Sequence, residues 1–319
     1  MEVGQVRASG WTNDLSWSPD SQSLYFTLSD DAKVHVLDVN GGPAPALGDA
    51  VMAFARVSRD ATALFYLDPS GKSNEVTPLL VKAPLSGAQI GQAVPVASDV
   101  SNQYIVSANG SQVAFHDYSE HLNFVDIPSG RTVTFPSAYP IAFAPGEKSL
   151  LAESYSPSQQ RFMLDLATGA RVPVLINSPF ALVTRWDGDM PRAVIDPTGV
   201  TDLVTGERHE LPAAGKLAAL GGDPFRPTHV FVWSSFCIQE EEVGGGWLGG
   251  ETNVQCVVQQ FQLHRIDLET YADDVVAQAA DYSTVTALSP DGRWLANAFP
   301  AGPNRAPVIY LKDMNEPSP

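Results

Sequence analysis

The chain has 319 residues, of which 44% are hydrophobic and 17% charged, so it is long and apolar enough to bury a substantial core. Its formal net charge of −17 argues against nucleic acid as a partner, because a phosphate backbone needs a basic face. No run approaches the roughly 18 consecutive apolar residues of a membrane span, and the first residues show no signal-peptide pattern.

A serine-proline-aspartate turn between two apolar alternations recurs along the chain. It is first seen in LSWSPDSQSLYF (15–26) and is nearly copied in ALSPDGRWLA (287–296). The looser copies are RVSRDATALFY (56–66), IVSANGSQVAF (105–115), IAFAPGEKSLLAE (141–153) and two degenerate ones around Asp187 and Asp223. Proline sets φ for a turn and Asp or Asn caps its own backbone, so each copy predicts a β-hairpin.

A second motif follows each first one: a strand that ends in Asp, then two residues, then Thr or Ser and Gly. The copies are VLDVNGG (36–42), FVDIPSG (124–130), MLDLATG (163–169), VTDLVTG (200–206) and RIDLETY (265–271), with looser versions in LLVKAPLSG (79–87) and IYLKDMNEP (309–317). The landmark residues at 38, 82, 126, 165, 202, 267 and 313 are separated by 44, 44, 39, 37, 65 and 46 residues. A period of about 40 to 45 residues with four short strands per unit is typical of a β-propeller.

The seven units predict an all-β fold: a seven-bladed β-propeller of four-stranded antiparallel blades, forming a single domain over residues 1–319. The seventh unit contains only three strands, at 284–288, 294–298 and 308–312. The alternation EVGQVRA (2–8) precedes the first unit, so we expect it to supply the missing fourth strand of the last blade. Such closure removes an open sheet edge.

At these motifs the sequence resembles the TolB-type, WD40-like propeller repeats of bacterial envelope proteins. The resemblance is most specific at 15–26 and 287–296 and weakest in the fifth and sixth units. It implies a propeller that serves as a platform for binding proteins, and it does not fix a ligand.

The 65-residue interval contains an insertion, CIQEEEVGGGWLGGETNVQC (237–256), bracketed by the only two cysteines of the chain. The cysteines lie at the base of a hairpin, where two antiparallel strands would place them opposite each other, so we expect a Cys237–Cys256 disulfide. Closing this loop would contribute about 3 kcal/mol in the chain-entropy model. A disulfide implies an oxidising compartment, hence a periplasmic or secreted protein. Two buried, reduced thiols are the alternative.

The insertion also predicts a recognition arm on the top face of the propeller, which carries the loops between second and third strands. Its candidate binding residues are Glu240, Glu241, Glu242 and Trp247. An aromatic side chain among glycines and carboxylates favours a protein or peptide partner with a basic surface. The alternative is a solvated insertion without a role. Further binding candidates expected on the top face are Trp11, Asp14 and Tyr118.

The search for catalytic motifs yields no catalytic residue and no cofactor. The chain has no Gly-x-Ser-x-Gly elbow, phosphate loop, dinucleotide fingerprint or His-Glu-x-x-His. One cluster, HDYSEH (116–121), places His116 and His121 beside carboxylates, a combination that can hold a transition metal. The alternative is a polar turn that faces water.

These observations favour a non-enzymatic binding propeller of the cell envelope or exterior. The competing hypothesis is a metal-assisted glycan lyase or hydrolase with its site at the top of the central channel. A third is a domain of a longer protein.

Overall fold

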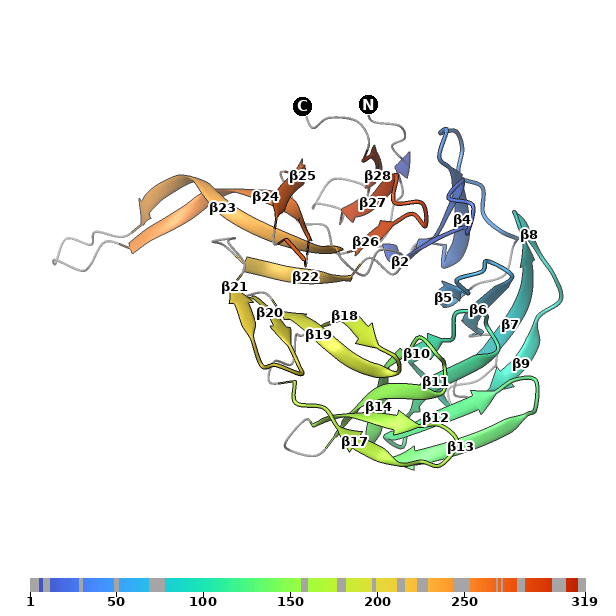
Figure 1. Ribbon diagram of the computed structural model, residues 1–319. Coiled ribbons are helices and arrows are strands. Elements are labelled where there is room, and N and C mark those ends of the chain that lie inside the picture. Colours follow the sequence, from blue (N-terminus) through green and yellow to red (C-terminus); the bar gives the residue numbers. More distant parts are fainter. Residues whose placement is uncertain are drawn as a thin grey trace. The chain divides into compact units, whose positions relative to one another are not determined.

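The computed structural model describes residues 6–7, 12–28, 31–48, 52–68, 78–155, 160–176, 182–196, 199–210, 216–222, 229–243, 253–267, 269–270, 272–279, 285–299 and 308–314. Within these ranges all regular structure is β, arranged as seven antiparallel sheets (Figure 1). In this part of the chain there is no helix long and apolar enough to cross a membrane. Seven small meandering sheets are the blades of a β-propeller, so the predicted fold class is confirmed.

The chain divides into two compact units, of which the first comprises Met1–Pro179, Trp186–Pro191 and Thr284–Asn315. It holds blades 1 to 4 and blade 7. Blade 1 contains β2 (Thr12–Trp17), β3 (Ser23–Leu28) and β4 (Lys33–Asp38); blade 2 contains β5 (Ala53–Val57), β6 (Ala63–Asp68), β7 (Leu79–Ser86), β8 (Gln89–Ile90) and β9 (Val94–Ala97). Blade 3 contains β10 (Val100–Val106), β11 (Gln112–Asp117), β12 (His121–Asp126) and β13 (Arg131–Pro136); blade 4 contains β14 (Ala138–Phe143), β15 (Ser149–Ser154), β16 (Arg161–Asp165) and β17 (Arg171–Pro173). Blade 7 contains β26 (Val285–Leu288), β27 (Trp294–Phe299), β28 (Val308–Asp313) and β1 (Val6–Arg7).

The second unit comprises Phe180–Arg185, Arg192–Ser283 and Glu316–Pro319. It holds blade 6 and most of blade 5, whose first turn is grouped with the other unit. Blade 5 contains β18 (Leu182–Asp187), β19 (Met190–Asp196), β20 (Gly199–Asp202) and β21 (Arg208–Glu210). Blade 6 contains β22 (Lys216–Gly222), β23 (His229–Val243), β24 (Asn253–Asp267) and β25 (Asp273–Ala279). The single domain predicted over residues 1–319 stays a prediction.

The N-terminal segment closes the last blade, as predicted. Strand β1 pairs antiparallel with β28, with Val6 opposite Ile309 and Arg7 opposite Val308. The order within this sheet is β1-β28-β27-β26, so a strand from the start of the chain completes a blade built from its end.

Two blades depart from the predicted four strands. Within the described residues blade 1 has three strands, and an isolated bridge between His35 and Ala46 stands at the position of the fourth. In blade 2, β7 pairs with both β8 and β9. The predicted landmark at Lys82 is corrected, because Lys82 lies inside β7 and its Nζ donates to the carbonyl oxygen of Gly110 at 2.7 Å. An ammonium group cannot accept the backbone N–H groups that an Asp cap accepts, so the strand continues past this position.

The serine-aspartate motif forms the same hydrogen-bonded turn in four blades. In blade 7, Ser289 Oγ donates to Asp291 Oδ1 at 2.6 Å and accepts from the backbone N–H of Trp294 at 2.8 Å, while Asp291 Oδ1 accepts from the N–H of Arg293 at 2.9 Å. The equivalent pairs are Ser18–Asp20, Ser58–Asp60 and Ser107–Asn109. These side chains accept hydrogen bonds from backbone N–H groups in the turn that have no partner in the sheet. They thereby fix the residue at which the strand after the turn begins.

The Asp-x-x-Thr-Gly motif forms the second kind of turn. Asp165 Oδ1 accepts from the backbone N–H of Ala167 at 3.0 Å and of Thr168 at 2.7 Å, and from Thr168 Oγ1 at 2.8 Å. Gly169 then takes a φ of 73°, a region that favours glycine. Asp126, Asp202 and Asp267 make the corresponding bonds.

The core of the first unit lies between blades, because the middle strands are buried on both faces. One cluster joins Ala114 and Leu122 of blade 3 to Leu150 of blade 4, and another joins Phe115 of blade 3 to Phe65 of blade 2. Successive residues of β11 therefore face different neighbouring blades. This alternation decides where the polar side chains at the end of β11 lie.

Candidate functional site

The turn between β11 and β12 carries the predicted residues 116–121. Asp117 organises it: its Oδ1 accepts from the backbone N–H of Ser119 at 2.9 Å and of His121 at 2.8 Å, and its Oδ2 accepts from Asn123 Nδ2 at 2.8 Å. His121 Nδ1 lies 3.3 Å from the same Oδ2. Asp117 thus uses its acceptor capacity on its own hairpin, whereas Tyr118 at the tip is 60% exposed.

His116 is the least satisfied polar side chain of this turn. It is only 8% exposed, and within the described residues its Nε2 is buried without a hydrogen-bond partner. Its Nδ1 is 3.5 Å from Ser101 Oγ, at the outer limit of a hydrogen bond. Desolvation lowers the pKa of His116, against the opposing effect of the carboxylates of Asp117 and Glu120, so the imidazole is neutral at pH 7.

An aromatic side chain from the next blade covers this imidazole. The Tyr155 ring, 44% exposed, stacks on His116 with 5.1 Å between ring centroids, and the Tyr139 ring meets Tyr155 edge-on at 5.5 Å. The Tyr139 hydroxyl donates to Glu153, and burial together with this carboxylate raises the pKa of Tyr139. Glu153 is itself paired with the buried Arg161, with Nε and Oε2 2.8 Å apart. The arrangement offers one neutral imidazole nitrogen beneath an exposed aromatic ring.

The two histidines of the predicted metal pair lie on opposite faces of blade 3. His116 follows the alternation of Ala114 and faces blade 4, whereas His121 pairs with Asp117 on the other face, together with Asn123. Among the described side chains, no group of three or more His, Cys, Asp or Glu is placed to hold a metal ion. Metal binding at His116 and His121 stays a prediction.

A serine, a histidine and an aspartate form a hydrogen-bonded row across blade 6. Ser234 Oγ lies 2.7 Å from His264 Nε2, and His264 Nδ1 lies 2.8 Å from Asp273 Oδ1. These are the distances of a catalytic triad. Ser234, however, is 3% exposed and lies within the paired part of β23, so a substrate carbonyl cannot reach its hydroxyl. We therefore assign Ser234, His264 and Asp273 a structural role in holding the strands of blade 6 together.

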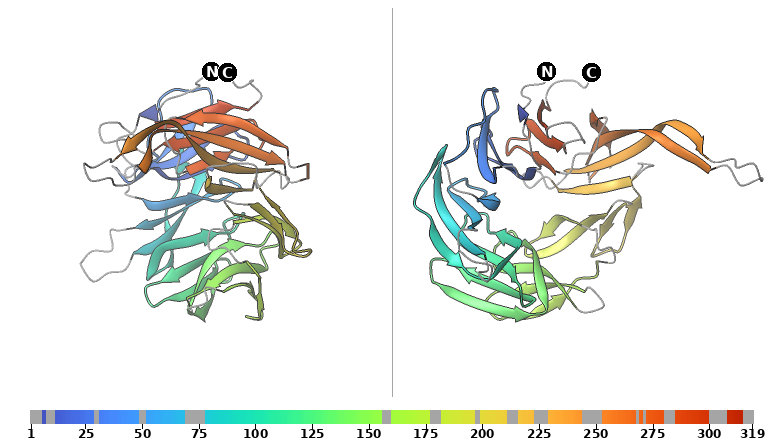
Figure 2. Two further views of the ribbon diagram at one scale, coloured as in Figure 1. Left: turned by 90° about the vertical axis from the view of Figure 1, so that its left-hand side faces the viewer. Right: turned by 180° about the vertical axis from the view of Figure 1, so that it is seen from behind.

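The predicted insertion is an extension of two blade strands. Strands β23 and β24 pair from His229 opposite Asp267 to Val243 opposite Asn253. In the part of the chain that the structure describes, β22 pairs with β23 as far as Ser234 and β25 pairs with β24 from Phe261. Residues 236–243 and 253–260 therefore form a two-stranded segment that runs past β22 and β25, drawn in orange (Figures 1 and 2). We call it the stapled ribbon.

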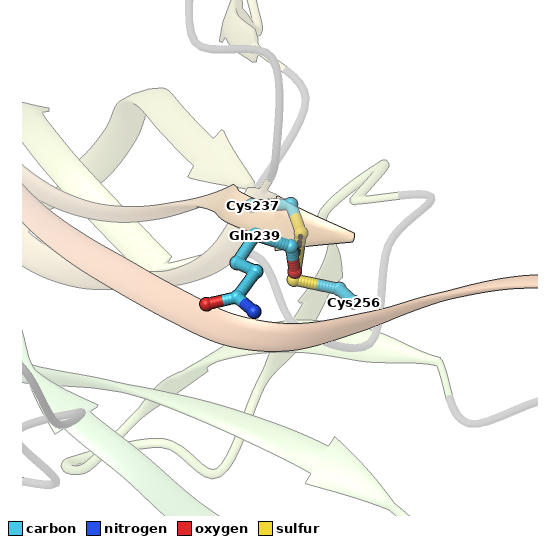
Figure 3. The surroundings of a disulfide bond; sticks show 3 residues. All are labelled: Cys237, Gln239 and Cys256. Atoms are coloured by element: carbon cyan, nitrogen blue, oxygen red, sulfur yellow. Dashed lines mark hydrogen bonds between the residues drawn. A yellow bond between two sulfur atoms is a disulfide. The ribbon is translucent and has the colours of Figure 1, made fainter. Parts of the chain in front are cut away.

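The predicted disulfide is present within the ribbon, with 5.7 Å between the Cα atoms of Cys237 and Cys256. The expectation that the cysteines are opposite each other is wrong: Cys237 is opposite Gln259 and Cys256 is opposite Glu240. The ladder register shifts on both sides of Gln239, and this irregularity lets the bridge cross the ribbon diagonally. The Gln239 carbonyl oxygen lies 3.1 Å from Cys237 Sγ (Figure 3). This is a contact and not a hydrogen bond, since a disulfide sulfur has no proton to donate.

The predicted binding residues of the arm are only partly described. The backbones of Glu240, Glu241 and Glu242 lie in β23, opposite Cys256, Gln255 and Val254. Asp14 lies in β2, and nothing is described of its side chain. Trp247 and Trp11 lie outside the described residues.

The partners that make His116 distinctive cannot be read from the sequence around it. Tyr155 belongs to the next blade, and no local motif links it to residue 116. The row of Ser234, His264 and Asp273 was missed for the same reason, although a correct register for the β23–β24 hairpin would have brought Ser234 near His264.

Comparison with known proteins identifies the fold alone. No protein-family model matches the chain, and no curated protein matches its sequence. Among solved structures, an oligogalacturonate lyase in complex with manganese is similar over 98% of this chain and 91% of its own, with 12% identity and a TM-score of 0.63.

Two further structures show the same likeness. An oligogalacturonate lyase from Vibrio parahaemolyticus is 11% identical over 97% of this chain and 91% of its own, with a TM-score of 0.59. A chain of a mitotic checkpoint complex is 12% identical over 98% of this chain and 94% of its own, with a TM-score of 0.58. At these identities one fold accommodates an enzyme and a component of a protein assembly.

Proposed function

We propose that this protein is a non-enzymatic binding propeller that engages a protein or peptide through the stapled ribbon. The observation that carries the proposal is the ribbon itself: two strands that leave their blade and are held together by a disulfide. A two-stranded ribbon is marginally stable in water. A disulfide within it restricts its conformations and so preorganises a surface for binding a partner. A solvated insertion without a role has no need of that bridge.

The same disulfide supports a periplasmic or secreted location. Disulfides persist in oxidising compartments and are rare in the reducing cytosol. Both cysteines of the bridge are partly exposed, so cytosolic reductants would have access to it.

The sequence of the ribbon and its tip supports a basic partner. Three consecutive glutamates lie in β23, and Trp247 follows them in a glycine-rich stretch of the sequence. Aromatic anchors dominate the energetics of many interfaces, and rim carboxylates steer a partner of opposite charge.

The test compares capture of the native partner by matched variants of the full chain. We expect Trp247→Ala to weaken binding about tenfold or more at an unchanged melting temperature, because an aromatic anchor contributes on the order of 2 kcal/mol. Val204→Ala is the control: Val204 is 69% exposed in the β20–β21 turn of the same unit and should change neither quantity. Equal capture by wild type, Trp247→Ala and a chain lacking residues 238–255 would exclude the ribbon as the binding surface.

A second candidate function is a metal-assisted glycan lyase. Two oligogalacturonate lyases share the fold, one of them in complex with manganese, and His116 has a neutral imidazole whose Nε2 has no partner among the described residues. The test incubates the protein with oligogalacturonate and Mn²⁺ and follows the ultraviolet absorbance of the unsaturated product of β-elimination. The binding proposal expects no turnover. Turnover that His116→Ala abolishes would replace it with the lyase.

A further inference from the structure

The stapled ribbon presents backbone edges that no third strand covers in the described structure. Among the described strands, β24 alone pairs with β23 from Glu240 to Val243, and the described pairing of β22 reaches only Ser234. The other edge of this segment is the one with which β22 pairs inside the blade. A strand edge of this kind is a template for the addition of another strand.

Charge determines which strand this edge accepts. Glu240, Glu241 and Glu242 are consecutive in the edge strand, and the whole chain has a net charge of −17. A second copy would bring three more glutamates against these three, and like charges directly opposite one another destabilise a pair of strands. Lysine or arginine on an incoming strand would instead form favourable cross-strand pairs.

The register shifts beside Gln239 limit the length of the template. They separate the regular pairing of Glu240–Val243 from the ladder of the blade. Bulges interrupt strand pairing, so an added strand is confined to the outer part of the ribbon. This restricts the site to a short, acidic edge.

Resting on the proposed function, we propose that the outer edge of β23 over Glu240–Val243 binds an extended, lysine- or arginine-rich segment of a partner protein by antiparallel or parallel strand addition. Backbone hydrogen bonds to this edge provide the affinity. The glutamates select a basic segment and exclude a second copy of the chain.

The experiment measures the affinity of an alternating Lys-Thr peptide, used as the probe, for the intact protein. Its control is the same peptide N-methylated at two consecutive central residues, which removes a donor from each edge without changing the charge. We expect the methylated peptide to bind about tenfold more weakly, because lost backbone donors leave their acceptors unpaired. Hydrogen exchange should show new protection of the amides of Glu240–Val243 with the unmethylated peptide alone.

A charge-matched variant completes the test. Replacing Glu240, Glu241 and Glu242 with glutamine should weaken binding of the Lys-Thr peptide. A Glu-Thr peptide should not bind the wild-type protein. Equal binding of methylated and unmethylated peptides, or no new amide protection, overturns strand addition. If Trp247→Ala nevertheless weakens capture of the native partner, the proposed function stands and only the mode of binding fails. If ribbon deletion leaves that capture intact, the proposed function fails as well.

Discussion

Most buried polar side chains in the described structure have partners that the strand register supplies. Glu153 pairs with Arg161 from the neighbouring strand, and His264 lies between Ser234 and Asp273. Two exceptions among the described residues are His116, whose Nε2 is buried without a partner, and Gln112, whose Oε1 is too. A buried group of this kind costs free energy, and for the imidazole the cost depends on its protonation state.

Because the His116 imidazole is buried, we expect the protein to lose stability as the pH falls. Desolvation lowers the pKa of His116 in the folded protein, whereas the unfolded chain protonates it at about 6.5. Below that pH the unfolded state binds more protons, so stability present above about pH 6.5 is lost as the pH falls through the folded pKa. Asp117 and Glu120 act against this shift, and His121 adds to it.

The measurement is urea unfolding of wild type and His116→Leu at pH 7.5 and pH 5.5. The free energy of unfolding should fall more steeply between these two values in the wild type than in the variant, because leucine does not titrate. The same pH dependence in both proteins would show that His116 keeps an ordinary pKa in the folded state.

At the scale of single elements, short-range hydrogen bonds and long-range cross-links have different roles. The serine-aspartate and Asp-x-x-Thr-Gly turns bond within a few residues and position strand ends. The ribbon instead has one bridge between residues 19 apart in sequence, and no described flanking strand pairs with it beyond Ser234 and Phe261.

Removing the bridge should loosen the ribbon and leave its blade folded. In the Cys237→Ser/Cys256→Ser double variant we expect the amides of 237–243 to exchange at least about tenfold faster, since an isolated two-stranded ribbon is marginally stable. The β23 residues paired with β22, Val230 to Ser234, should keep their protection. Hydrogen exchange and thermal melting on the same sample test this, and a large drop in melting temperature would mean that ribbon and blade unfold together.

At the scale of the whole molecule, one short pairing connects the two ends of the chain. Val6 and Arg7 pair with Ile309 and Val308, and this pairing covers the edge of β28. The described part of β1 contributes two paired residues, and it completes the sheet of blade 7.

Deletion of residues 2–7 should expose the edge of β28 and lower the melting temperature by about 1 to 2 °C, because a loss of on the order of 1 kcal/mol is divided by the large unfolding entropy of a 319-residue chain. Deletion of residues 2–4 is the matched control, because it leaves β1 in place. Identical melting curves for the two deletions would show that β1 contributes nothing to the stability of the propeller.

Much of the fold was predictable because its information is local. The turn motifs bring a serine and an aspartate two residues apart into contact, so their chemistry can be read from short stretches. Their spacing predicted seven units, and the alternation at 2–8 predicted closure by β1. Lys82 was misassigned because a Gly-containing turn nearby imitates the motif without the carboxylate that caps it.

The sequence by itself thus determined the repeat, the turns, the closing strand and the pairing of the two cysteines. Only the tertiary structure decided that His116 and His121 face different blades, that Tyr155 covers His116 and that the disulfide crosses the ribbon diagonally. The physical reason is that these contacts depend on strand register and on the packing of one blade against the next. A shift of one residue in register moves every side chain of a strand to the other face, and no short stretch of sequence specifies that outcome.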